Sequence, residues 1–141
     1  MSPQDQKLEL LASVRLFGKC GSKEIQRLGE LSDVIDLPAG RVLMRQGETG
    51  QEMMIIVEGR AAIEKDGQTI AERGPGDVVG EMALLTEMPR RATVTLITDA
   101  RLLVVGHREF HALMDEMPSV RAQVMEALAL ALMDAETPQA R

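Results

Sequence analysis

A short segment in the second half of the chain combines a glycine, a carboxylate and an arginine. Gly80 and Glu81 come first, and Arg90 follows them at close spacing. Glycine lets a backbone approach a ligand closely, while a guanidinium offers a planar, two-pronged donor that suits a phosphate. Residues 81–85 favour a short helix, whose first N–H groups form an anion site. With the carboxylate of Glu81 as an acceptor for sugar hydroxyls, the segment predicts a small phosphate-and-sugar site.

The elements that must position this segment are short strands. Between about residues 33 and 106, short apolar runs alternate with glycine turns, and Asp66-Gly67 is a strong hairpin signal. Such spacing favours a β-barrel, sandwich or jelly roll. The predicted strands are residues 34–37, 42–44, 53–57, 61–65, 68–71, 93–97 and 102–105.

Helical periodicity flanks this β region on both sides. Apolar residues recur at helical spacing over 7–14 and again after Ser22, which is a good N-cap candidate. Helices are also expected over 109–117 and from Pro118 to residue 133. We therefore expect one domain over residues 1–133, followed by a disordered tail at 134–141.

Composition excludes several classes of protein. Sixteen Lys and Arg against 22 Asp and Glu give 141 residues a net charge of −6, which disfavours nucleic acid as a partner. No apolar run approaches the roughly 20 residues of a membrane helix, and residues 1–5 lack the features of a signal peptide. One cysteine, Cys20, permits no internal disulfide. We expect a cytoplasmic protein without membrane insertion.

The segment resembles the phosphate-binding cassette of the cyclic nucleotide-binding domain family, which includes Crp-like regulators and protein kinase A regulatory subunits. The matching residues are Gly80-Glu81-Met82-Ala83-Leu84 and then Pro89-Arg90-Arg91-Ala92-Thr93. The likeness extends from about residue 16 to residue 132. It implies a mainly β fold, an eight-stranded jelly-roll barrel with N-terminal helices and two C-terminal helices.

The resemblance also implies roles for individual residues. Glu81 would accept from the ribose 2′-hydroxyl, helped by the backbone of Gly80. Arg90 would pair with the cyclic phosphate, and the N–H groups of Ala83 and Arg91 would complete its cradle. The implied ligand-binding set is Gly80, Glu81, Met82, Ala83, Arg90, Arg91 and Ala92. Candidates for base contacts or a lid are Val78, Met125, Leu128 and Leu132.

Two departures from the family pattern bear on the ligand. Arg91 stands where the family commonly has Ala or Ser, or Thr in cGMP-selective members, so cAMP is favoured over cGMP. The only aromatic residues are Phe17 and Phe110, so any lid must be aliphatic and its stacking on a purine weaker.

These features predict a non-catalytic cAMP sensor in which the last helix moves on ligand binding and signals to an unknown effector protein. No metal or other cofactor is expected, because His107 and His111 have too few companions to form a metal site. The chain reads as a free-standing or excised domain, a monomer or a weak homodimer through the stripe at Val124, Leu128 and Leu132. In the alternative interpretation, Glu81 and Arg90 form a structural ion pair, and the barrel is a protein-interaction module.

Overall fold

A computed structural model describes residues 2–14, 17–84 and 86–134 of the chain. Its internal contacts divide it into two compact units, Ser32–Glu109 and Met1–Leu31 with Phe110–Arg141. Each unit is described by itself below, and a single domain over residues 1–133 stays a prediction. Of the predicted disordered tail at 134–141, Asp134 is the last residue of a helix, and residues 135–141 lie outside the described residues.

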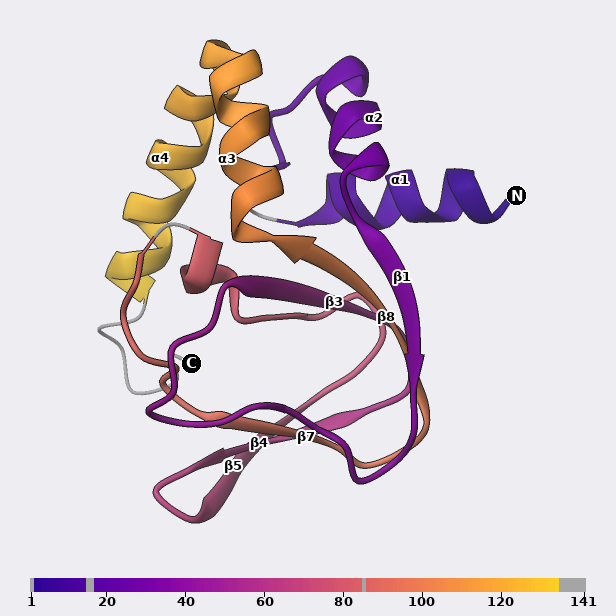
Figure 1. Cartoon of the computed structure of the whole chain (residues 1–141), viewed down its shortest axis with the longest axis vertical. Coiled ribbons are helices and arrows are strands. Elements are labelled where there is room, and N and C mark those ends of the chain that lie inside the picture. Colours follow the sequence, from indigo (N-terminus) through magenta and orange to yellow (C-terminus); the bar gives the residue numbers. More distant parts are fainter. Residues whose placement is uncertain (1, 15–16, 85, 135–141) are drawn as a thin grey trace. The chain divides into compact units, whose positions relative to one another are not determined.

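The first unit is built from strands (Figure 1). They pair antiparallel in two four-stranded sheets with the orders β1-β8-β3-β6 and β2-β7-β4-β5. This arrangement confirms the predicted mainly β, jelly-roll class. The strands are β1 (Asp33–Leu37), β2 (Val42–Met44), β3 (Glu52–Glu58), β4 (Ala61–Lys65), β5 (Gln68–Arg73), β6 (Val78–Val79), β7 (Thr93–Leu96) and β8 (Ala100–Gly106).

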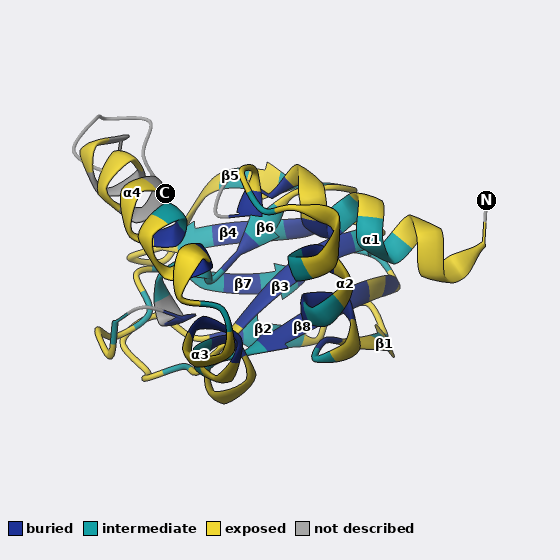
Figure 2. Ribbon diagram, turned by 90° about the horizontal axis from the view of Figure 1, so that it is seen from above, coloured by how far each residue is buried: buried dark blue, intermediate teal, exposed yellow. Residues whose placement is uncertain are grey.

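A shared core joins the two sheets. In β4, Ala61 and Ile63 are buried while Ala62 and Glu64 are half-buried, as expected when successive side chains point to opposite faces of a sheet. Burial is concentrated along β3 and β8 (Figure 2). The core cluster consists of Met44, Met54, Ile56, Ala61, Ile63, Val79, Val94, Leu96, Ala100, Leu102 and Val104.

The predicted strands agree with the observed ones except at β6 and at several ends. The two residues of β6 are too few for a hydrophobic period, and their pairing with β3 defines them as a strand. Strand β8 is longer than predicted because β1 and β3 hold it from both sides, from Ala100 to Gly106. Strand ends are therefore set by partners that are distant in the sequence.

The second unit is helical. It contains α1 (Pro3–Ser13), α2 (Ser22–Glu30) and α4 (Pro118–Asp134), and α3 (His107–Glu116) crosses into it from the first unit. The prediction that Ser22 caps α2 is wrong, because Gly21 occupies the N-cap without a side-chain hydrogen bond and Ser22 is already helical. The start of α4 at Pro118 is confirmed.

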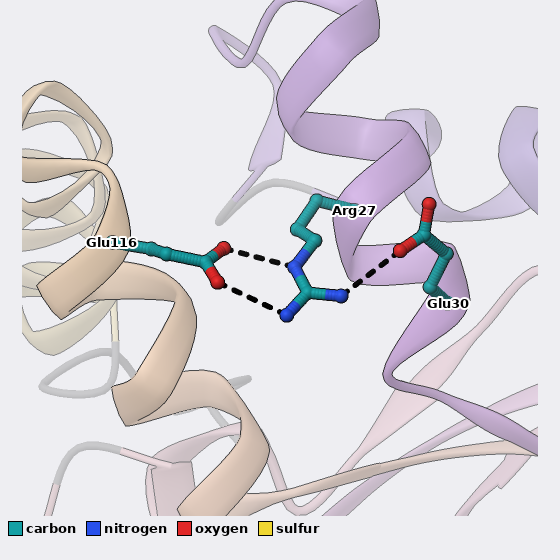
Figure 3. A network of polar contacts seen from close by, with 3 residues as sticks. All are labelled: Arg27, Glu30 and Glu116. Atoms are coloured by element: carbon teal, nitrogen blue, oxygen red, sulfur yellow. Dashed lines mark hydrogen bonds and ion pairs between the residues drawn. The ribbon is translucent and has the colours of Figure 1, made fainter.

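An aromatic pair and the hydrogen bonds of Arg27 stabilise this helical unit. The rings of Phe17 and Phe110 are both buried, and their centroids lie 5.9 Å apart. Arg27 of α2 donates to Glu116 of α3 through Nε at 2.8 Å and Nη2 at 3.0 Å, and to Glu30 through Nη1 at 2.9 Å (Figure 3). Among the described residues, no helix is long and apolar enough to cross a membrane.

Candidate functional site

Gly80 is the turning point between β6 and the 3-10 helix η2 (Glu81–Leu84). Its φ is +77°, in the left-handed region that favours glycine. A Cβ at this position would lie 2.6 Å from Cε of Met44 and 3.0 Å from the carbonyl oxygen of Glu52, and it would overlap Nη1 of Arg90. Both the backbone and its neighbours therefore require glycine here.

Arg90 lies beside this turn, and main-chain oxygens hold its guanidinium. Nη2 donates to the carbonyl of Glu52 at 2.9 Å, and Nη1 donates to the carbonyl of Gly80 at 3.4 Å. The side chain is half-buried, so desolvation lowers its pKa, and attraction to the Glu52 carboxylate opposes that shift. Arginine is nevertheless so basic that Arg90 keeps its charge at neutral pH.

The backbone of the Arg90 loop is fixed to the turn that follows β2. The Arg90 N–H donates to the carbonyl of Glu48 at 2.8 Å, and the Gly47 N–H donates to the carbonyl of Arg90 at 2.9 Å. The Gln46 N–H donates to Oγ1 of Thr93 at 3.0 Å. This loop therefore has few ways to move without breaking hydrogen bonds.

The same turn is joined to the β4–β5 hairpin. Nε2 of Gln46 donates to Oδ1 of Asp66 at 2.9 Å, and the Asp66 N–H donates to Oε1 of Gln46 at 2.9 Å. This reciprocal pair supports Asp66, whose φ is +53°.

The helix η2 supplies the remaining cassette residues. Glu81 and Met82 are half-buried, and the carbonyl of Met82 accepts from the Thr86 N–H at 2.9 Å and from Thr86 Oγ1 at 3.1 Å. Ala83 lies in η2. The first N–H groups of a helix point away from its body, in the direction from which an anion can accept from them.

The other predicted residues lie in different environments. Arg91 is exposed, so its side chain reaches solvent, and Ala92 packs against the core cluster. Val78 is half-buried in β6, and Met125 of α4 is exposed. The side chains of Leu128 and Leu132 lie outside the described residues.

The structure therefore brings Gly80, Glu81 and Arg90 together on adjoining segments. It adds two features that sequence reasoning missed, namely the Glu52 carbonyl and Gly50, whose bare backbone adjoins the Arg90 guanidinium. A carbonyl group belongs to every residue, so it leaves no signal in the sequence. Gly50 did leave a signal in the sequence, because it is a second glycine after Gly47 and comes just before a predicted strand.

Comparisons with known proteins match this fold. The family model described as "Cyclic nucleotide-binding domain" matches residues 34–117. The chain is 36% identical over 122 residues to a cyclic nucleotide-gated potassium channel of Rhizobium etli, covering 86% of this chain and 34% of the channel. The chain spans about a third of the length of the curated relatives that it matches.

Solved structures show the same architecture. The N-terminal domain of a transcriptional regulator from Streptomyces coelicolor A3(2) superposes with a TM-score of 0.80 at 26% identity, covering 89% of this chain and 91% of that one. The regulatory domain of Toxoplasma gondii PKA, co-crystallised with cAMP, gives a TM-score of 0.74 at 30% identity, with 78% and 44% coverage.

Proposed function

Because the chain belongs to the cyclic nucleotide-binding domain family, we propose that it is a non-catalytic sensor that binds cAMP, and cGMP less well, around Gly80 and Arg90. Binding a ligand of this kind shifts a protein between two states only if the ligand has different affinities for them. We propose that the two states differ in the position of the C-terminal helices α3 and α4, and that the ligand binds one of these states more tightly.

The observation that carries the proposal is the environment of Arg90. Within the part of the chain that the structure describes, its guanidinium hydrogen-bonds two neutral carbonyls and no carboxylate. A half-buried cation without a bonded counter-charge is costly. A cyclic phosphate supplies that charge together with acceptors for the guanidinium.

The other cassette residues complete the proposed contacts. Glu81 accepts from the ribose 2′-hydroxyl, and the turn at Gly80 lets the sugar approach the backbone. The N–H groups of Ala83 and Arg91 donate to the phosphate. Met82 and Ala92 are their neighbours in the chain and shape the surface around these donors.

The base is proposed to meet apolar side chains. Val78 of β6 lies two residues before Gly80, and Met125, Leu128 and Leu132 of α4 are the candidates for a lid. None of these side chains is aromatic, so base stacking contributes little. Arg91 has no hydroxyl like that of threonine to favour guanine, which is why cAMP is preferred.

The sensor is proposed to signal through a second protein. We propose an effector protein of unknown identity as the partner, with no nucleic acid, no membrane insertion and no metal or other cofactor. The single cysteine fits a cytoplasmic location. The protein is proposed to be a monomer or a weak homodimer.

Calorimetric titration tests the proposal, using protein that has been unfolded and refolded to remove bound ligand. We expect saturable binding of cAMP that is tighter than that of cGMP. Arg90→Ala should weaken it by roughly 10- to 100-fold, because a hydrogen bond to a charged group contributes about 1.5–3 kcal/mol.

Arg60→Ala is a matched control, because Arg60 is an exposed arginine of the same unit whose ion pair with Glu72 spans 3.2 Å. It should bind cAMP like the unmodified protein. No binding of either nucleotide would overturn the proposal and favour the protein-interaction module.

A further inference from the structure

We propose that Gly50 is a positioning residue for Arg90. Its bare backbone and the Glu52 carbonyl form a cradle, which fixes the guanidinium in the direction that an incoming phosphate needs. This inference rests on the proposed function, since it states how the phosphate-binding side chain is held before the ligand arrives.

The close approach of Gly50 to Arg90 is the first observation. A Cβ at Gly50 would overlap Nε, Cζ and Nη2 of Arg90, which are its three nearest neighbours. The guanidinium therefore lies directly against the Gly50 backbone, in the space that a side chain would occupy. Any other residue at position 50 would displace the guanidinium.

The second observation is that a Cβ at Gly50 would overlap only side-chain atoms of Arg90 among its three nearest neighbours. The overlapping atoms are the far end of a long side chain that can rotate away. Gly50 is also not among the glycines with positive φ, so alanine fits its backbone. Gly50→Ala should consequently fold like the unmodified protein and change the placement of Arg90.

Displacing the Arg90 guanidinium would break the hydrogen bonds that hold it in place. Its two hydrogen bonds, to the carbonyls of Glu52 and Gly80, require the present position. A long cationic side chain released into solvent regains rotamer freedom that ligand binding must remove again. Loss of this preorganisation lowers affinity for the anionic part of a ligand.

Gly74 provides a matched control. It too lacks a positive φ, and a Cβ there would meet nothing within 4 Å. Gly80 would be a poor test, because its φ of +77° and its contacts with Met44 and Glu52 would disturb the fold as well. Comparing Gly50→Ala with Gly74→Ala therefore isolates the contact with Arg90.

The binding test compares cAMP with adenosine, which lacks the phosphate. The unmodified protein and Gly74→Ala should bind cAMP more tightly than adenosine by the same ratio. Gly50→Ala should reduce that ratio by roughly tenfold or more while adenosine binds as before. A substitution that merely disturbed the structure would weaken both ligands, and that result would overturn the inference.

A double variant tests whether Gly50 acts through Arg90. In an Arg90→Ala background, Gly50→Ala should have no further effect on cAMP affinity, because the displaced side chain is already absent. Additive losses would contradict the proposed cradle.

A measurement without ligand separates this inference from the proposed function. Guanidinium N–H signals of Arg90 in ¹⁵N-labelled protein, assigned by their loss in Arg90→Ala, should exchange slowly with water in the unmodified protein and in Gly74→Ala. They should exchange fast in Gly50→Ala. Unchanged signals in Gly50→Ala would refute the cradle, whereas absent cAMP binding with the expected signals would refute only the proposed function.

Discussion

Arg90 of the β unit and Arg27 of the helical unit are two arginines held in opposite ways. Arg27 donates three hydrogen bonds to the carboxylates of Glu116 and Glu30, and these partners raise its pKa. Arg90 donates to two main-chain carbonyls, and burial lowers its pKa. The difference lies in the charge of the acceptors.

Under the proposed function, this difference distinguishes a structural arginine, Arg27, from a ligand-binding one, Arg90. The carboxylates around Arg27 already neutralise it, so an incoming anion would gain little there. Carbonyl dipoles orient the Arg90 guanidinium and leave its net charge in place. The alternative interpretation requires a structural ion pair between Glu81 and Arg90, whereas the acceptors of the Arg90 guanidinium are the carbonyls of Glu52 and Gly80.

Ligand binding should affect variants of the two arginines most differently. At a cAMP concentration about 100 times the dissociation constant, linkage adds about 2.7 kcal/mol to the free energy of unfolding. The melting temperature should then rise by roughly 5–10 °C. Arg27→Ala should keep this rise, while Arg90→Ala should lose it, as differential scanning calorimetry would measure. If Arg27→Ala also abolished the rise, Arg90 would not be the specific anion partner.

A smaller effect concerns stability without ligand. Arg90→Met removes a half-buried charge and keeps an apolar stem, so its melting temperature should equal or exceed that of the unmodified protein. Arg27→Met leaves Glu30 and Glu116 without their cation and should lower the melting temperature. The reverse order of the two variants would make Arg90 the structural residue.

A still smaller difference concerns how the ion pair of Arg27 with Glu116 makes stability depend on pH. Hydrogen bonds from Arg27 lower the pKa of Glu116, so this pair stabilises the folded state fully above the ordinary glutamate pKa of about 4.3. Its contribution is lost as the pH falls from there towards the lowered pKa.

Urea unfolding at stepped pH values measures this loss. Glu116→Gln cannot ionise, so it should lose stability less steeply than the unmodified protein over that acidic range. In an Arg27→Gln background the same substitution should leave the slope almost unchanged. An equally altered slope there would mean that Arg27 is not the cause of the lowered pKa.

Local patterns were enough to predict seven of the eight strands that the structure describes. The Asp66-Gly67 turn correctly joined β4 and β5, because a hairpin depends on residues that are close in the sequence. Strand β6 was missed because its two residues acquire their strand character from β3. The N-cap of α2 was misassigned because Ser22 and Gly21 both suit a cap, and only the backbone path distinguishes them.

The fold class and the segment that carries the proposed binding residues could be predicted from the sequence, because periodicity, turns and the cassette motif are local properties of the chain. The surroundings of each arginine, in contrast, depend on contacts between segments that are distant in the sequence. Arg27 and Glu116 are 89 residues apart, and Arg90 is 38 residues from Glu52. Residue types alone do not show which acceptor a folded chain brings to a guanidinium, and that acceptor's charge determines how strongly the arginine can still attract a phosphate.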